Sequence, residues 1–538
     1  MLLNKPKRIL SDKKVSILIV VLAIAARIAL QLYFFDVSGD RSFQLAATKS
    51  FVEGHGFSLP QVLPNDLHKK VYLPLVGWPP GYSIFLSPLY FVFNRNIVAA
   101  AIAFEVFTSI LFVFFSAKLL QLLNLPSWLV ALYTLTLGFF IYDFASASST
   151  DFQSLTFFLI GIYYSMLFIK KEKPPLFGSA IAIILFLPAL TRYMYASAVL
   201  IPPLYLLWTG YVEKNKRLIR GSFYCFVTLI SLLTCLFVYQ HYYTGSAVYL
   251  GSPHRGFYPS HLLRIHPFLF SPFLNIQIFC TGLHSLFGFD YVKEVDIIRY
   301  IHLIPFVATL FSAAIYFVHN LNNKKILSEH FVYIGLLSCF NIIFLLIFLS
   351  VTNAPEHKVS NFIWTYVEEP RYYAFVTLFI QQLVFIFLFN KKQKRKFVLK
   401  IFTAICAVLL TIQVLHGIYF VGKKLTTENH DFTIKKQQEA AQAFFYASLD
   451  SLQNHHPNKQ VVSISNDITF QNLGTLKDYS GLYKVDSIDR LTSLNSTDVI
   501  FLVVLPDDVR QRHETFLQQP YLKFIGAVGG YYFYTLQT

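Results

Sequence analysis

The chain has 538 residues, of which 55% are hydrophobic and 17% aromatic, while only 14% are charged. Soluble domains usually carry about 25% charged residues. The composition therefore excludes an ordinary soluble enzyme and indicates lipid as the main solvent. The formal net charge of +16 does not indicate nucleic-acid binding, because Lys and Arg lie in short clusters between apolar runs. Such clusters are typical of the cytoplasmic loops of membrane proteins.

The first apolar run covers residues 15–35 and follows a basic N-terminal segment. It is too long for the core of a signal peptide, and no small-residue cleavage site follows it. We interpret it as a permanent first span with the N-terminus in the cytoplasm. A long loop on the outer side of the membrane then follows.

Apolar runs of roughly 20 residues recur as far as residue 420 and predict about eleven membrane-spanning helices. The runs near Pro188 and Pro202 are short enough to be broken helices. This assignment places the basic clusters on one side, which we take as the cytoplasmic side. The predicted spans are residues 15–35, 97–123, 128–142, 152–169, 176–190, 195–208, 218–242, 300–317, 331–350, 372–389 and 397–420.

After residue 423 the composition becomes that of a soluble domain. Residues 437–452 have helical periodicity, residues 460–464 and 499–505 resemble buried strands, and residues 521–534 predict two strands that turn at Gly529 and Gly530. The fold class is therefore an α-helical polytopic membrane protein with a small extracytoplasmic α/β domain. We expect the membrane domain to cover residues 1–423 and the soluble domain residues 424–538.

Acidic and basic residues gather on the predicted outer side of the membrane. Sugar transfer from a lipid phosphate needs both kinds: a carboxylate to accept the proton of the acceptor, and cations to hold the leaving phosphate. For each residue alone, a solvated or helix-capping role is the alternative. The residues are Asp36, Asp40, Asp143, Asp151, Arg192, His254, Arg255, His261, Arg264, His266, Glu368, Glu369 and Arg371.

Several short motifs occur in a characteristic order. Residues 39–46 read GDRSFQLA, residues 53–58 read EGHGFS, and residues 78–82 read WPPGY; Ser149-Thr150-Asp151 and Glu369-Pro370-Arg371-Tyr372-Tyr373 follow. This order resembles the GT-C glycosyltransferases, the superfamily that contains protein O-mannosyltransferases and the aminoarabinose transferases acting on lipid A. The resemblance implies the GT-C fold and a catalytic acid just after the first span.

The resemblance assigns roles to individual residues. It implies Asp40 as the general base, and Asp151 is the competing candidate for that role. The candidates for binding the donor phosphate are Lys69, Lys70, Arg192, Arg255 and Arg371, and those for contacting substrate are Tyr82, His254 and Glu369. Arg41 stands where the family often has a second acid, and a lone carboxylate is a poor divalent-cation site. No cofactor is therefore predicted, and a divalent metal is disfavoured.

The predicted activity is an inverting transfer of a hexose or pentose from a polyprenyl-phosphate donor to a lipid, protein or envelope-glycan acceptor, outside the inner membrane. One alternative is a polymerase or ligase of lipid-linked glycans, for which the loop of residues 245–298 matters more than Asp40. Another is a transporter or flippase, which needs essential charges near the bilayer midplane and often has duplicated halves. Arg27 and Glu105 are its candidates, but no duplication is visible.

Overall fold

The computed structural model describes two compact units, which are treated separately. One contains Met1–Phe34, Val76–Pro79 and Glu105–Phe420; the other contains Phe35–Leu75, Pro80–Phe104 and Val421–Thr538. The structure describes residues 13–35, 37, 39–63, 66–139, 149–245, 257–259, 327–352, 370–389, 411, 415, 418, 430–465, 467–483, 498–512 and 522–536.

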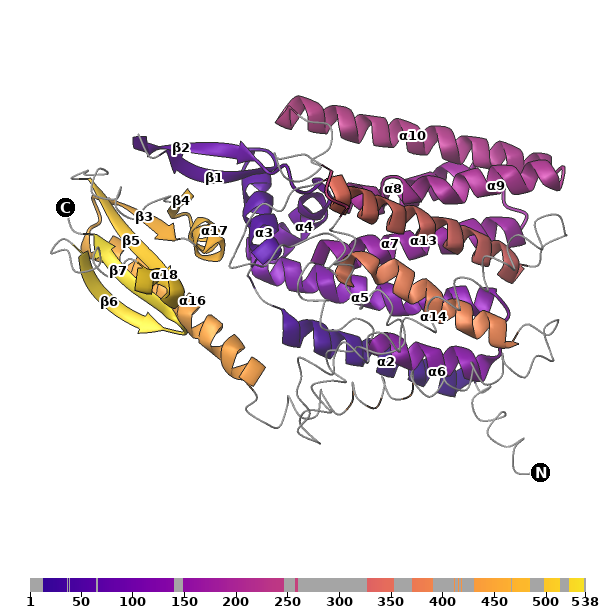
Figure 1. The fold of residues 1–538 in the computed structure, drawn as a ribbon, viewed down its shortest axis with the longest axis horizontal. Coiled ribbons are helices and arrows are strands. Elements are labelled where there is room, and N and C mark those ends of the chain that lie inside the picture. Colours follow the sequence, from indigo (N-terminus) through magenta and orange to yellow (C-terminus); the bar gives the residue numbers. More distant parts are fainter. Residues whose placement is uncertain are drawn as a thin grey trace. The chain divides into compact units, whose positions relative to one another are not determined.

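The first unit is a bundle of apolar helices that lie side by side (Figure 1). Among the residues that the structure describes, six helices are long and apolar enough to cross a membrane. The predicted spans at residues 300–317 and 397–420 fall almost wholly outside those residues, so the total of eleven stays a prediction. The helices are α2 (Lys13–Phe34), most of α5 (Ile97–Leu122), α6 (Ser127–Gly138), α7 (Ser149–Lys170), α8 (Phe177–Thr191), α9 (Ile201–Val212), α10 (Lys216–Thr244), α13 (Leu327–Thr352) and α14 (Ala374–Phe389).

Small residues allow these helices to approach closely. A Cβ atom added to Gly178 of α8 would lie 1.9 Å from the carbonyl oxygen of Gly221 in α10. A Cβ atom added to Gly335 of α13 would lie 1.8 Å from the ring of Phe379 in α14. Helices in lipid associate mainly through close van der Waals packing, because lipid chains are as apolar as the side chains. The glycines therefore contribute directly to helix association.

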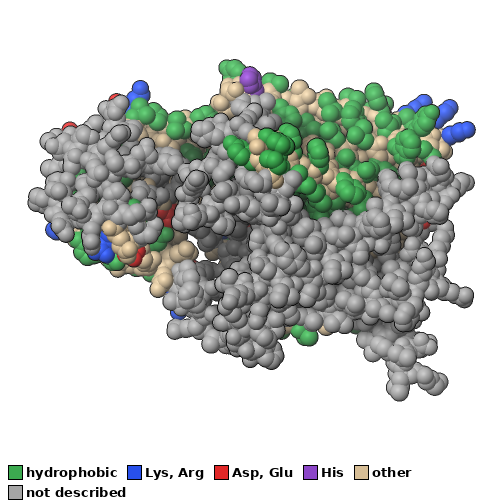
Figure 2. Space-filling view, viewed as in Figure 1, with side chains coloured by type: hydrophobic (Ala, Val, Ile, Leu, Met, Phe, Trp, Pro, Cys, Tyr) green, Lys and Arg blue, Asp and Glu red, His purple; other side chains and the backbone are tan. Residues whose placement is uncertain are grey.

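The outer face of α10 is covered by large hydrophobic side chains. Phe223, Val238 and Tyr242 are 58%, 62% and 91% exposed, respectively. Figure 2 shows hydrophobic side chains spread over this part of the bundle, with Lys and Arg side chains at one end. A protein surrounded by water rarely exposes an apolar surface of this extent. The face fits contact with lipid chains.

The helical path is interrupted between α8 and α9. Pro188 lies in the last turn of α8, and Arg192 follows with an extended backbone (φ −150°, ψ 122°). Two 3₁₀ turns, η2 (Tyr193–Tyr195) and η3 (Ala198–Leu200), then lead to α9, which begins just before Pro202. The prediction of broken helices around Pro188 and Pro202 is confirmed. The interruption brings Arg192 to a helix end.

The second unit is built around a five-stranded sheet with the order β4-β3-β5-β7-β6. Strands β4, β3 and β5 are parallel, whereas β7 is antiparallel to β5 and β6. The turn between β6 and β7 contains Gly529 and Gly530, both with positive φ. The elements are α16 (His430–His455), β3 (Gln460–Ser465), α17 (Ile468–Leu476), β4 (Ser480–Tyr483), β5 (Val499–Pro506), α18 (Asp507–Arg512), β6 (Leu522–Val528) and β7 (Tyr531–Leu536).

The segment that follows the first span folds with this sheet. It forms α3 (Gly39–Val52), the antiparallel hairpin of β1 (Ser58–Leu63) and β2 (Asp66–Pro74), and α4 (Gly81–Val92). Val62 of β1 is 2% exposed and belongs to the same buried cluster as Val462 and Phe501 of the sheet. The expected domain boundary between residues 423 and 424 stays a prediction. Residues 35–75 and 80–104 belong to the same compact unit as residues 421–538.

Candidate functional site

In the helical unit, Asp151 occupies the first turn of α7, and its side chain is only 6% exposed. A carboxylate is favoured at this end of a helix, because the backbone N–H groups there are unpaired and carry partial positive charge. The site around Asp151 is therefore anchored at the beginning of a long buried helix.

Arg192 makes a two-pronged contact with Asp151. Its Nε donates to Oδ1 of Asp151, and its Nη2 donates to Oδ2 at 2.6 Å. Both side chains are nearly buried, with 10% and 6% exposure. The planar guanidinium matches the two carboxylate oxygens, which gives a strong, charge-assisted pair with fixed geometry. Ser154 and Thr191, whose hydroxyl oxygens are 2.7 Å apart, join α7 to α8 beside this pair.

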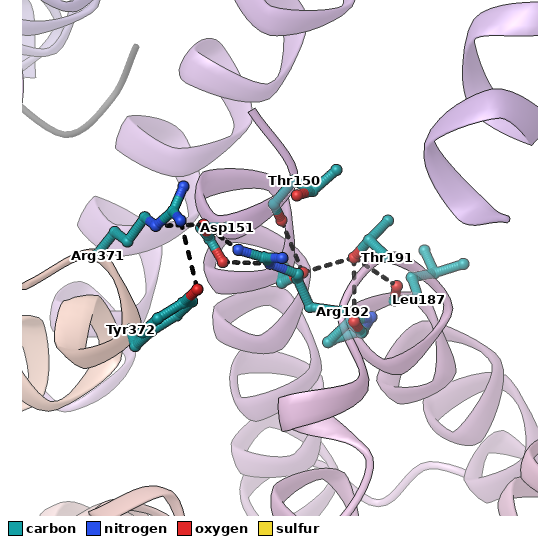
Figure 3. Close-up of polar contacts among 9 residues, drawn as sticks. Thr150, Asp151, Leu187, Thr191, Arg192, Arg371 and Tyr372 are labelled. Atoms are coloured by element: carbon teal, nitrogen blue, oxygen red, sulfur yellow. Dashed lines mark hydrogen bonds and ion pairs between the residues drawn. The ribbon is translucent and has the colours of Figure 1, made fainter. Parts of the chain in front are cut away.

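A second arginine approaches the same carboxylate. Arg371 lies in η7 (Pro370–Tyr373), and its Nε is 3.7 Å from Oδ2 of Asp151. Its Nη2 donates to the hydroxyl of Tyr372 at 3.3 Å, and its guanidinium lies 5.1 Å from the centre of that ring. Arg192 lies 5.5 Å from the same ring. Figure 3 shows Asp151 between the two arginines, with Tyr372 alongside.

The charges of this cluster do not cancel. Two guanidinium groups face one carboxylate, so Asp151, Arg192 and Arg371 together carry a net charge of about +1 at neutral pH. Guanidinium groups present planar sets of donors that match phosphate oxygens, so the cluster suits an anionic ligand such as a phosphate.

In the second unit, Asp40 lies in the first turn of α3, immediately after Gly39, which has φ +51°. The Asp40 side chain is partly exposed, as a group that must meet a substrate requires. Arg41 is buried, and its guanidinium lies 4.5 Å from the centre of the Phe35 ring, so this cation stacks on an aromatic ring. A partly exposed carboxylate at a helix N-terminus can accept a proton from an incoming hydroxyl.

Gln44 was not singled out from the sequence. It lies one turn after Asp40 and is 1% exposed, and neither side-chain amide atom has a hydrogen-bond partner in the part of the chain that the structure describes. Burial of an unpaired amide is unfavourable. Gln44 lies four residues after Asp40 and therefore on the same face of the helix. This spacing could have identified Gln44 from the sequence.

The remaining candidates divide into three groups. Lys69 and Lys70 are exposed on β2, and the ammonium of Lys70 lies 5.9 Å from the Tyr72 ring. Tyr82 is fully buried in α4 and packs edge-on against Phe104, with ring centres 6.1 Å apart. Their roles in phosphate and substrate binding stay predictions. Three candidates lie outside the described residues: His254, Arg255 and Glu369.

Within the described ranges, no group of three or more His, Cys, Asp or Glu side chains could hold a metal ion. The charged cluster in the helical unit contains a single carboxylate, and a hard divalent cation needs several oxygen ligands. Its two arginines would also repel a cation. The described residues of that cluster are therefore suited to an anion.

The chain was compared with solved structures. The structure is similar to ArnT. Two crystal structures of ArnT from Cupriavidus metallidurans, one in the apo state and one bound to undecaprenyl phosphate, match with TM-scores of 0.41 and 0.45. Sequence identities are 12% and 13%, and each match covers 96% of this chain and 97% of the ArnT chain.

ArnT is an aminoarabinose transferase of the GT-C superfamily, the group that the sequence motifs resemble. No protein-family model matches the chain, and no curated protein matches it significantly. At these identities and TM-scores, the likeness to ArnT carries no inference about substrates or residue roles. Those depend on the residues of this chain.

Proposed function

We propose that this protein is a membrane glycosyltransferase that moves a sugar from a polyprenyl-phosphate donor to an acceptor on the extracytoplasmic side of the inner membrane. The observation that carries the proposal is the buried cluster of two arginines and one carboxylate at the ends of apolar helices. A lipid-linked phosphate sugar combines an anionic group with a long apolar chain. A cationic cluster at the ends of apolar helices suits the anionic part, and the apolar helices suit the chain.

In the proposed reaction, the acceptor hydroxyl loses its proton to Asp40 and its oxygen attacks the anomeric carbon of the sugar. The bond between that carbon and the phosphate oxygen breaks, and polyprenyl phosphate leaves with the bonding electrons. Negative charge on the phosphate increases in the transition state. Arg192 and Arg371 then stabilise the transition state more than the ground state, which is the condition for a gain in rate. Attack from the face opposite the phosphate inverts the anomeric centre.

The two alternative functions, a glycan polymerase or ligase and a transporter, predict different products. A polymerase or ligase of lipid-linked glycans also releases a lipid carrier, but its acceptor is a glycan and it depends less on Asp40. A transporter or flippase moves the intact lipid and releases no phosphate carrier. Undecaprenyl phosphate release from a radiolabelled undecaprenyl-phosphate sugar, measured with the purified protein in liposomes, distinguishes transfer from transport. Absence of release, with label crossing the bilayer, would contradict the proposal.

Replacement of Arg371 by Lys is expected to weaken the binding of undecaprenyl phosphate by about tenfold, because the ammonium keeps the charge but loses the planar fork of donors. Undecaprenyl phosphate is the probe because it joins a phosphate group to a long apolar chain, the two parts expected of the donor carrier. Binding is measured by tryptophan fluorescence in detergent, with neutral undecaprenol as the reference ligand. Arg217→Lys is the matched control, since Arg217 donates to backbone carbonyls including those of Phe168 and Lys171. Equal binding by Arg371→Lys and wild type would remove Arg371 from the phosphate site.

The membrane topology is tested by cysteine labelling in intact cells. Asn472 is 6% exposed and donates a hydrogen bond to Ser42, so it is a poor labelling position. Lys523 on β6 is exposed and is chosen as the labelling position. Glu172, between α7 and α8, serves as the cytoplasmic control. We expect an impermeant maleimide to label Lys523→Cys in intact cells and Glu172→Cys only after permeabilisation. The opposite pattern would place the sheet domain in the cytoplasm.

A further inference from the structure

Helix α17 of the sheet domain lies against α3, the helix that begins beside Asp40. These helices are more than 400 residues apart in the sequence, and both belong to the second unit. One face of α17 packs into the sheet domain through Phe470 and Leu473, which are 2% and 1% exposed. A different face of α17 makes polar contacts with α3, so α17 connects the sheet to α3.

The first contacts are made at Gly39, the residue before Asp40. The hydroxyl oxygen of Thr469 accepts from the Gly39 backbone N–H at 3.4 Å. Asn472 Nδ2 donates to the hydroxyl of Ser42 at 2.9 Å, and that hydroxyl donates to the Gly39 carbonyl oxygen at 2.7 Å. Helix α17 therefore binds both backbone polar groups of Gly39: it contacts the N–H directly and the carbonyl group through Ser42. Glycine has no Cβ atom, so the backbone at Gly39, which has a positive φ, could adopt many conformations unless contacts restrict it.

The second set of contacts lies at the other end of both helices. Lys49 Nζ donates to the carbonyl oxygens of Thr475 and Leu476, both at 3.0 Å, and to Oδ1 of Asp478 at 2.6 Å. Its side chain is only 10% exposed. The last carbonyl groups of a helix lack partners within the helix and favour a cation. Lys49 thus caps α17 from α3, and it fixes the separation and register of the two helices.

We infer that the sheet domain positions Asp40 through α17, and that Lys49 and Asn472 are the positioning residues. This role goes beyond the proposed transfer reaction, although the kinetic part of its test rests on that reaction. Neither residue has to touch the substrate. Their contacts hold α3 at both ends, so Asp40 keeps one orientation relative to the sheet domain. This assigns a function to the C-terminal part of the chain.

The test combines hydrogen–deuterium exchange with single-turnover transfer. We expect Lys49→Met and Asn472→Asp to speed amide exchange in residues 39–52 by about tenfold, because each removes hydrogen bonds that restrain α3. Turnover should fall by about tenfold, while the KM for the donor changes less than twofold, since donor binding does not need these contacts. Lys49→Arg keeps charge and donors, so it should restore most of the activity lost in Lys49→Met.

Lys477→Met is the matched control. Lys477 is a neighbouring lysine that pairs with Asp450 at 3.2 Å in an exposed contact. We expect it to change neither exchange in α3 nor turnover. Unchanged exchange in Lys49→Met and Asn472→Asp would overturn the inference, as would faster exchange with full turnover. If the wild type transfers no sugar, the proposed reaction fails, and exchange in residues 39–52 alone decides whether α17 restrains α3.

Discussion

Single-turnover transfer by Asp40→Asn is expected to be at least about 100-fold slower than by the wild type, with donor binding largely unchanged. Asparagine has nearly the same shape as aspartate but cannot accept the proton of the acceptor hydroxyl. Asp40 lies in the first turn of α3 and is partly exposed, so its replacement should have little effect on folding. The rate is measured with the purified protein in liposomes, in excess over the donor.

The control for this variant is Asp66→Asn, because Asp66 is an exposed acid at the start of β2 in the same loop region. It should retain the wild-type rate. Near-normal transfer by Asp40→Asn, in protein that is folded and binds donor, would rule out Asp40 as the base. The role would then pass to Asp151 or to the loop of residues 245–298.

Replacement of Asp151 by Asn should destabilise the protein rather than simply slow the chemistry. The carboxylate accepts two hydrogen bonds from Arg192 and lies 3.7 Å from Arg371. Breaking a buried pair by removing one partner typically costs about 3 to 5 kcal/mol, because the remaining charge is left uncompensated. We expect a clear fall in the thermal unfolding temperature in detergent and the loss of most transfer.

Undecaprenyl phosphate should stabilise Asp151→Asn more than it stabilises the wild type, since the phosphate replaces the missing anion beside the two arginines. A ligand that binds only the folded state raises stability in proportion to the logarithm of its concentration over Kd. Asp450→Asn is the control, because Asp450 pairs with Lys477 at an exposed position and such pairs contribute about 0 to 1 kcal/mol. A stable Asp151→Asn protein without transfer would instead assign Asp151 to the chemistry.

Local sequence patterns predicted the elements of this protein where one residue type dominates over a short range. The apolar runs gave six membrane-crossing helices at or close to the expected positions, because hydropathy over about 20 residues depends on the segment alone. The strands β3 and β5 and the glycine turn at Gly529 and Gly530 also lie where the apolar runs and turn residues placed them. Tertiary contacts were not needed for these inferences.

The candidate site could be predicted only as a set of residues. Asp151, Arg192 and Arg371 were all named from their places at helix ends, yet the arginines lie 41 and 220 residues after Asp151, which gave no reason to pair them. The pairing depends on the end of α8 near Pro188 and on the 3₁₀ turn that carries Arg371. The sequence therefore left Asp151 as a competing base, whereas the structure shows its contacts with two arginines.

The sequence by itself indicated a membrane protein, most of its apolar helices, and the acids and bases near their ends, because hydrophobicity and charge are local properties. The tertiary structure alone decided that residues 35–75 pack with the C-terminal sheet, that Lys49 caps α17, and that one carboxylate holds two arginines. Such contacts join segments far apart in the chain, and their energy comes from burial and geometry that no local pattern encodes.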